Sequence, residues 1–455
     1  MVNENVLQVQ QKFVRTRKML DVKKRIEVLK LLRQNIKLRE NEIYEALKTD
    51  LNKSRQEAYM TEIGIVFEEI SYMLKHVRKL AKPKRVHTPL NNFPAKSYIR
   101  PMPYGCVLVI SPWNYPFMLS LGPIVDAVAA GNSVVLKPSE NSAHTSAVLK
   151  KIIEETFERG HVDVVVGGRD ECSNLLDMNF DYIFFTGSTR VGQLVMQKAA
   201  ENFTPVTLEM GGKSPCVVDE TANIKLAARR MVFGKFLNAG QTCVAPDFVY
   251  CHKQIKNELV EALKEEIIKQ YTDNPIACAY FPKMISKKQF DNISKYIEQD
   301  KIIYGGKTNP EALKIEPTLM DATFEDGIMQ EEIFGPIFPI LEFENLEEAV
   351  ENLNKMNKPL AFYHFSTSKK NQKYMEDFCD FGGGCINDTI MHIANPNLPF
   401  GGVKHSGIGS YHGKKGFETF THHKSIVKKA NWLDLPLRYQ PIGKFKEWLI
   451  RLFLK

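Results

Sequence analysis

The sequence contains little cysteine, and none of it is arranged to organise a fold. Among 455 residues there are eight cysteines, no two of them in a C-x-x-C pair, and no Cys/His cluster has zinc-site spacing. Cysteine this sparse does not build a disulfide scaffold, so most of these thiols should be buried and inert. We therefore expect no metal site and no disulfide-bonded secreted domain.

Long apolar runs are missing as well. No stretch of about 18 apolar residues occurs, which argues against a membrane-spanning helix, and the polar N-terminus has no apolar signal core. We therefore expect a cytoplasmic protein. With 44% hydrophobic and 25% charged residues, the chain has the composition of a globular enzyme, and its length predicts two or three domains.

Positive charge is unevenly distributed along the chain. The formal net charge is +8, and residues 424–455 carry eight Lys/Arg against Asp434 and Glu447, a net charge of +6. A basic tail can face nucleic acid, an anionic membrane or only solvent. The favoured interpretation is a solvated basic face, and we expect no nucleic acid partner.

The first 82 residues have the pattern of helices. Apolar residues recur at helical spacing, as at Val6, Val9 and Phe13, and an amphipathic run over Tyr59–Ala81 ends before Pro83. Residues 84–103 are polar and proline-containing, which suits an extended excursion from the domain body.

From residue 105 onward, short apolar strands alternate with helical stretches such as Pro116–Ala130 and Ser142–Glu158. The expected strands are Cys106–Ile110, Ser133–Leu136, Val162–Val166, Tyr182–Phe185, Val206–Leu208 and Cys216–Val218. Apolar strands joined by helices predict a parallel sheet covered on both faces, an architecture that binds dinucleotides.

A second βα series follows residue 243 and predicts a second α/β domain. Its expected strands are Phe248–Cys251, Pro339–Phe343, Ala361–Phe365 and Cys385–Asn387. Its expected helices are Ile255–Gln270 and Leu346–Lys355, and Ser425–Val427 is a candidate late strand.

Two turns at strand ends are candidates for cofactor binding. Gly187 and Gly192 follow a strand and open a helix, where the backbone can approach a phosphate, although an ordinary tight turn is equally open. Lys137 and Glu140 also follow a strand and suit the hydroxyls of an adenosine ribose. The alternative there is a helix cap by Ser139 with a glutamate in the first turn.

A side-chain amide and a thiol are candidates for catalysis. Asn114 ends a strand, where its amide can stabilise an oxyanion, although capping the helix near Pro116 is the favoured reading of this residue by itself. Cys243 follows the polar, glycine-containing run Asn238–Thr242. A thiol near backbone donors can become a thiolate, so a nucleophile and a structural thiol are both open.

Two carboxylates are further candidates for catalysis or cofactor binding. Glu209 ends an apolar strand before a glycine pair, where a surface salt bridge would be the common outcome. Glu332 and Phe334 can hold a ribose and a nicotinamide, or be an exposed acid and a core aromatic. A thiol that attacks a carbonyl and a carboxylate that later activates water would together make a two-stage covalent oxidation.

In this order, the motifs closely resemble those of the aldehyde dehydrogenase superfamily from about residue 100 to 425, with weaker similarity in the helical N-terminus. Glu209–Pro215 is similar to the glutamate signature of the family, and Gly240–Cys243 to its cysteine signature. Thr242–Asp247 and Gly409–Lys414 resemble the class 3 branch, which includes dimeric enzymes acting on aromatic and medium- to long-chain aldehydes.

The resemblance implies NAD(P)+-dependent oxidation of aldehydes to carboxylic acids through a cysteine thiohemiacetal and a thioester. Cys243 would be the nucleophile, Asn114 with the Cys243 backbone N–H would hold the oxyanion, and Glu209 would be the base for deacylation. The implied NAD or NADP site consists of Lys137, Glu140, Gly187, Ser188, Gly192, Glu332 and Phe334. Tyr115 and Phe400 would contact the aldehyde.

The resemblance also implies an α/β fold with a Rossmann-like cofactor domain, an α/β catalytic domain and a small β extension that joins two subunits in a homodimer. The corresponding ranges are 1–83 with 104–210 for NAD(P) binding, 211–400 for catalysis and 84–103 with 420–430 for the extension. Residues 431–455 would form a basic amphipathic tail. Its apolar segment Trp448–Leu454 is either a peripheral membrane contact or, slightly favoured, a flap over the substrate entrance.

Some features depart from the family pattern or favour rivals. Val403–Ser406 replaces a usually smaller, glycine-containing stretch near the substrate mouth, which puts the aldehyde specificity in question. Glu140 would repel the 2′-phosphate of NADP, although class 3 relatives often accept both cofactors. CoA-acylating relatives generally lack the base glutamate, so Glu209 argues against that reaction, and the basic C-terminus is the reason to consider a non-catalytic scaffold.

Overall fold

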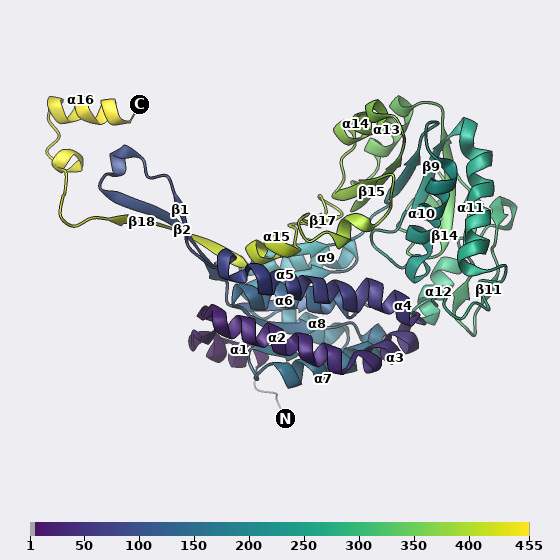
Figure 1. Ribbon diagram of the computed structural model, residues 1–455, viewed down its shortest axis with the longest axis horizontal. Helices are drawn as coiled ribbons and strands as arrows, with labels where there is room; N and C mark the ends of the chain where they lie inside the picture. The colour runs from purple at the N-terminus through teal and green to yellow at the C-terminus, as the bar shows by residue number, and fades with distance from the viewer. Residues whose placement is uncertain (1–4, 455) are drawn as a thin grey trace.

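The computed structural model describes residues 5–454, which form two α/β bodies and a projecting arm (Figure 1). Helices of the N-terminal segment pack against the first body, as the sequence predicts for residues 1–82. They are α1 (Val6–Arg15), α2 (Val22–Leu38), α3 (Glu40–Leu51), α4 (Arg55–Ala58) and α5 (Gly64–Leu80). A π-helical turn over Tyr59–Ile63 joins α4 to α5.

The first body contains a six-stranded sheet in the order β17-β7-β6-β3-β4-β5, parallel except for β17. The strands are β3 (Cys106–Ile110), β4 (Ser133–Lys137), β5 (Val162–Val164), β6 (Tyr182–Thr186), β7 (Val206–Glu209) and β17 (Gly407–Ile408). Four helices connect them: α6 (Met118–Ala130), α7 (Ala143–Thr156), α8 (Arg169–Leu176) and α9 (Thr189–Glu201).

Alternate residues of β3 belong to different hydrophobic clusters. Val107 and Val109 pack in one core, whereas Leu108 and Ile110 pack in another. Both faces of this sheet are therefore covered, as the continuous apolar strands predict. The carboxyl ends of its five parallel strands lie along one edge, and the structure extends β4, β6 and β7 to include Lys137, Thr186 and Glu209.

The second body contains a seven-stranded sheet in the order β10-β13-β14-β9-β8-β15-β16. Its strands are β8 (Pro215–Val218), β9 (Phe248–His252), β10 (Ile302–Tyr304), β13 (Thr318–Asp321), β14 (Ile337–Phe343), β15 (Ala361–Phe365) and β16 (Gly383–Ile386). Its helices are α10 (Ile224–Phe236), α11 (Lys256–Tyr271), α12 (Lys287–Ser294), α13 (Leu346–Lys355) and α14 (Lys369–Phe378). Two further short strands, β11 (Thr308–Asn309) and β12 (Lys314–Ile315), pair with each other.

The arm is a three-stranded antiparallel sheet of β1 (Lys84–Val86), β2 (Ala95–Pro103) and β18 (Thr421–Lys429). Strand β18 begins after the short helix α15 (Gly413–Thr419) and carries the chain away from both bodies (Figure 1). None of the helices between residues 5 and 454 is both long and apolar enough to cross a membrane.

The C-terminal helix α16 (Lys444–Phe453) lies at the far end of this arm (Figure 1). Its large side chains face solvent, with Phe445 71% and Trp448 58% exposed. The tail therefore does not pack over the substrate entrance of its own chain, and that expectation is wrong. The physical reason is β18, whose pairing with β2 directs the following residues outward.

Candidate active site

Two cavities meet where the carboxyl edge of the first sheet faces the second body. One has a volume of about 900 Å³ and the other about 820 Å³. Four residues line both of them: Leu119, Thr186, Glu209 and Cys243. The structure thus brings together the thiol and the carboxylate that the sequence singles out from separate motifs.

Cys243 follows a tight turn between α10 and β9. Asn238 and Ala239 adopt left-handed conformations, with φ of 51° and 52°. At Gly240 φ is 75°, and a Cβ there would lie 2.3 Å from the carbonyl oxygen of Gly335, so only glycine fits. Gln241 is fully buried, and its Nε2 donates to the carbonyls of Asn238 and Lys283 (3.0 Å each), so this polar residue holds the turn.

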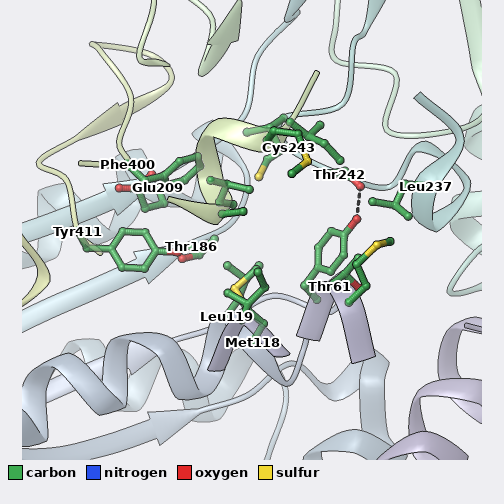
Figure 2. Close-up of a pocket in the computed structure, with 18 of the residues that line it drawn as sticks. Thr61, Met118, Leu119, Thr186, Glu209, Leu237, Thr242, Cys243, Phe400 and Tyr411 are labelled. Atoms are coloured by element: carbon green, nitrogen blue, oxygen red, sulfur yellow. Dashed lines mark hydrogen bonds between the residues drawn. The ribbon is translucent and has the colours of Figure 1, made fainter. Parts of the chain in front are cut away.

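Asn114 reaches this turn from the loop after β3. Its Nδ2 donates a 3.1 Å hydrogen bond to the carbonyl of Gln241, two residues before the thiol. Because α6 begins only at Met118 and this amide points to the cysteine turn, the helix-capping interpretation of Asn114 is wrong. Next to it, the Tyr115 hydroxyl lies 2.6 Å from Thr242 Oγ1 (Figure 2).

Glu209 ends β7 opposite Thr186 of β6, with its side chain buried. Neither of its carboxylate oxygens has a hydrogen-bond partner among the described residues. Burial raises the pKa of Glu209 well above the usual value because no nearby positive charge offsets the desolvation of its carboxylate. The common outcome for such a residue, a surface salt bridge, does not apply here.

The thiol of Cys243 is protonated at neutral pH. Burial, followed by the charges of Glu332 and Glu209, raises its pKa to about 12, and its own backbone N–H and that of Val244 lower it less. The expectation that local backbone donors produce a thiolate is therefore incomplete. Desolvation outweighs them, and the proton must leave as the sulfur reacts. Cys106 is a buried, inert thiol as expected, 1% exposed.

The cavity of about 820 Å³ contains most of the expected cofactor residues. It is lined by Gly187, Ser188, Glu332 and Phe334, together with Trp113, Asn114, Met210 and Gly211 among others. Ser188 is the N-cap residue of α9, so the positive end of that helix opens into the cavity. A Cβ on Gly187 would lie 2.6 Å from the Phe185 ring, so glycine lets this ring pack closely against the turn.

Glu332 is buried at the other end of this cavity. Burial and then the charge of Asp247 raise its pKa to about 8, whereas the backbone N–H of Gly212 and the ammonium of Lys213 lower it. A Cβ on Gly211 would lie 2.1 Å from Glu332 Oε2, so the glycine pair lets this carboxylate approach the backbone. Lys213 donates to Asp247 and to the carbonyls of Ile328 and Glu331, which anchors the loop that carries Glu332.

Three expected cofactor residues lie outside the lining of both cavities. Lys137 and Glu140 form a 3.5 Å ion pair at the end of β4, along the same sheet edge. Ser139 also caps the short turn that follows, accepting from the Asn141 N–H at 3.3 Å, so the capping interpretation holds there too. Gly192 packs against Met210, whose sulfur would lie 2.4 Å from an added Cβ.

The cavity of about 900 Å³ has an almost wholly apolar wall (Figure 2). Both expected aldehyde contacts, Tyr115 and Phe400, line it. Sequence reasoning missed the rest of the lining: Met60, Thr61, Ile65, Met118, Leu119, Thr186, Phe233, Leu237, Thr242, Val244, Ile390, Met391, Ile393, Ala394 and Tyr411. Of these, Thr242 and Val244 stood in the motif stretch Thr242–Asp247 and Tyr411 in Gly409–Lys414, but none of the three was expected to contact the aldehyde.

The stretch Val403–Ser406 is not part of this wall, contrary to expectation. The carbonyl of Ser406 accepts the Met210 N–H at 3.0 Å beside β17, and none of the four residues lines either cavity. Strand β17 pairs with β7, which places this stretch against the backbone next to Glu209. Its sequence therefore does not decide the shape of the apolar cavity.

Comparison with known proteins agrees with this geometry. The model of the aldehyde dehydrogenase family matches residues 2–426. The chain belongs to the aldehyde dehydrogenase family. It is 46% identical over 447 residues to the 4,4'-diaponeurosporen-aldehyde dehydrogenase of Staphylococcus aureus, with 97% of each chain covered.

Two further similarities extend the assignment. The dimeric NADP-preferring aldehyde dehydrogenase of Canis lupus familiaris is 42% identical over 420 residues, covering 92% of this chain and 93% of the relative. The substrate-bound structure of Staphylococcus aureus AldH superimposes with a TM-score of 0.98 at 45% identity, covering both chains completely. The aldehyde dehydrogenase described here oxidises aldehydes to carboxylic acids with NAD or NADP, and its relatives include several members of family 3.

Proposed function

We propose that Cys243, Asn114 and Glu209 carry out the oxidation through a covalent thioester. The observation that carries this proposal is the position of Cys243 and Glu209 on the wall shared by both cavities, with the Asn114 amide on the cysteine turn. An aldehyde in the apolar cavity and a dinucleotide in the other would meet only at this wall.

In the first stage, the sulfur of Cys243 attacks the aldehyde carbon. Its proton passes to Glu332, the carboxylate whose charge acts most on the thiol, so that Glu209 stays free to act as the base of the second stage. The Asn114 amide and the Cys243 N–H donate to the oxyanion, an interaction typically worth about 3–4 kcal/mol per donor. When bound, NAD or NADP supplies the acceptor for the hydride that leaves the carbon.

In the second stage, Glu209 takes a proton from water, which attacks the thioester and releases the acid. A base works best when its pKa lies near the working pH, and burial moves Glu209 in that direction. Its two unpartnered oxygens are free to bind that water.

The cofactor residues are proposed from their positions. Gly187 and Ser188 at the start of α9 would hold the pyrophosphate, and Glu332 and Phe334 the nicotinamide ribose and ring. Lys137 and Glu140, farther along the same edge, would bind the adenosine ribose. Gly192 would act indirectly, by letting α9 pack close to Met210.

The apolar cavity supports medium- or long-chain aliphatic or aromatic aldehydes as substrates. Apart from hydroxyls, the carboxyl of Glu209 and the sulfur atoms of Cys243 and the methionines, its lining is hydrocarbon and aromatic. Burying apolar substrate surface would therefore provide most of the binding energy. We assign cofactor binding to residues 1–83 and 104–210, and the catalytic domain to residues 211–400.

We further propose a cytoplasmic homodimer that pairs through the arm, residues 84–103 and 420–430. Helix α16 supports a peripheral membrane contact, because exposed Phe445 and Trp448 accompany Lys444, Lys446 and Arg451. Cosedimentation with anionic vesicles, of the full chain and of a chain lacking residues 440–455, tests this contact. Equal sedimentation of the full chain and the shortened chain would contradict a membrane contact through α16.

The experiment for the reaction is reduction of NAD+ and NADP+ by the purified protein with short, long-chain and aromatic aldehydes, with and without CoA. We expect reduction that needs no CoA and is lost in Cys243→Ala. The control is Cys172→Ala, a partly buried thiol outside both cavities. Turnover only in the presence of CoA would mean that CoA, and not water, accepts the acyl group.

A further inference from the structure

Beneath the active site lies a cluster of buried charges that neither cavity includes. Lys53, Glu57 and Glu62, from the segment between α3 and α5, are 2%, 8% and 0% exposed. Buried ionisable groups persist when they are paired and hydrogen-bonded. Their partners here are the two chain segments that present Asn114 and Cys243.

Lys53 and Glu62 hold the segment that carries Asn114. The ammonium of Lys53 donates to Glu62 Oε1 at 2.6 Å and to the carbonyl oxygen of Asn114 at 3.0 Å. Glu62 Oε2 accepts the N–H groups of Phe117 (2.9 Å) and Met118 (3.0 Å), where α6 begins. Glu62 thereby performs, from another helix, the capping that the sequence reading gave to Asn114.

The same ammonium contacts the neighbouring residue as well. Lys53 Nζ lies 3.9 Å from the centre of the Tyr115 ring, within the range of a cation–π interaction. The Tyr115 hydroxyl lies 2.6 Å from Thr242 Oγ1, one residue before Cys243. One positive charge therefore contacts both the backbone of Asn114 and Tyr115, a residue that lines the cavity of about 900 Å³.

Glu57 holds the cysteine turn. Its Oε1 accepts the Asn238 N–H at 2.8 Å, at the first of the two left-handed residues. The Asn238 side chain donates to the carbonyls of Asn114 (2.8 Å) and Gln241 (3.1 Å). The Asn114 carbonyl is thus the point at which Lys53 and the cysteine turn meet.

We propose that Lys53, paired with Glu62, is a positioning residue that aims the Asn114 amide at the oxyanion formed on Cys243. A charge-assisted hydrogen bond in a dry interior is strong and directional, so it fixes the peptide unit next to the reacting amide. A buried ion pair is not required for stability, since apolar substitutes of similar volume are often neutral. This inference rests on the proposed role of Asn114.

The test uses the full chain with both charges removed together, Lys53→Met with Glu62→Gln, so that no buried charge is left unpaired. We expect kcat to fall about tenfold to thirtyfold, because a donor aimed less well stabilises the transition state less. The KM for NAD+ should stay within about twofold, since the pair does not face the cofactor cavity. If the double variant does not fold, Lys53→Met alone is measured, with the same fall in kcat expected, because Glu62 still accepts the N–H groups of Phe117 and Met118.

A matched control is Lys314→Met. Lys314 is also buried and donates to two backbone carbonyls, those of Ile276 and Cys278 at 3.2 and 2.7 Å, but it lines neither cavity. We expect its kcat to stay within about twofold of wild type, as for changes away from the site. A fall equal to that of the Lys53 variant would assign the effect to general destabilisation and overturn the proposal.

A double-mutant cycle with Asn114→Ala decides the mechanism. Once the amide is absent, we expect removal of the Lys53–Glu62 pair to cost less than about twofold in kcat, because interacting residues are not additive. Equal costs in both backgrounds would mean that the pair does not act through Asn114. Wild-type kcat in Asn114→Ala itself would overturn both this inference and the proposed oxyanion site.

Discussion

The two cavities that meet at Cys243 are built by different physical means. The cavity of about 900 Å³, where we propose that the aldehyde binds, is lined by apolar side chains from the helices and loops of both bodies, with almost no polar surface. The cavity of about 820 Å³, where we propose that the cofactor binds, is lined by strand-end turns whose glycines let Phe185 and Glu332 pack close to the backbone. The buried carboxyl of Glu332 is its charged group at neutral to basic pH. Shape and hydrocarbon contact would select one ligand, and backbone geometry with fixed charge the other.

Of the residues proposed for chemistry, Cys243 and Glu209 lie on the shared wall, and Asn114 lines only the cavity of about 820 Å³. Burial raises the pKa of both Cys243 and Glu209, and the charges of Glu332 and Glu209 raise that of Cys243 further. Substitutions on the shared wall should therefore alter the reaction itself. Substitutions on an outer wall should change the KM for one ligand and leave the KM for the other unchanged.

The largest effect is expected for Glu209→Gln on the shared wall. The amide keeps the shape of the side chain but cannot take a proton from water, so steady-state turnover should fall about 100- to 1000-fold. Stopped-flow detection of NADH should still show a first-turnover burst. The control is Glu220→Gln, an exposed glutamate that should behave as wild type. Wild-type turnover in Glu209→Gln would show that Glu209 is not the base.

The next effect concerns the proton on Cys243. Because its pKa is raised to about 12, the thiolate fraction below that pH rises with pH. Alkylation by iodoacetamide should therefore accelerate about tenfold per pH unit between about pH 7 and pH 9. Mass spectrometry distinguishes Cys243 from the other seven cysteines. A rate that is already constant at pH 7 would show that the thiolate is preformed.

A smaller effect, limited to the KM for NAD+, is expected for Gly211→Ala. The added Cβ would lie 2.1 Å from Glu332 Oε2 and must displace that carboxylate. The KM for NAD+ should rise about tenfold, whereas the aldehyde KM stays within about twofold. Gly327→Ala, where a Cβ meets nothing within 4 Å, is the matched control. Equal changes in both KM values would contradict the separation of the two walls.

The smallest effect is expected for Phe400→Leu on the opposite wall. Losing part of an aromatic contact should lower kcat/KM for long-chain and aromatic aldehydes about threefold. Acetaldehyde is too small to need this contact, and its kcat/KM should stay the same. Initial rates at low aldehyde concentration measure both values. A change in the KM for NAD+ would show that Phe400 affects the cofactor side as well.

The five parallel strands of the first sheet were predictable to within about two residues, because a strand buried on both faces is a continuous apolar run. Strand β17 of this sheet was missed, and Cys216–Val218, expected with the first series, belongs to the second sheet as β8. Strands β10 and β13 were missed because they are short and β10 is only half-buried. Strand β16 begins two residues earlier than predicted, at a glycine pair that hides it. Each missed strand has a weak apolar pattern in the sequence and forms because it pairs with a neighbouring strand in the folded protein.

The functional residues divide in the same way. Cys243, Glu209 and Asn114 stand in recognisable motifs, so the sequence names them. Lys53 and Glu62 do not, because a lysine and a glutamate between amphipathic helices have the pattern of a solvated face. Only their packing beneath the loop after β3 makes them internal.

The sequence by itself determined most of the central strands and their alternation with helices, the chemical groups available for catalysis and the family to which the chain belongs. The tertiary structure decided that Cys243 is a neutral thiol, that Glu62 rather than Asn114 caps α6, and that α16 lies away from the aldehyde cavity. The physical reason is that local structure depends on near neighbours along the chain. Desolvation, charge pairing and cavity shape depend on residues that folding brings together from distant positions.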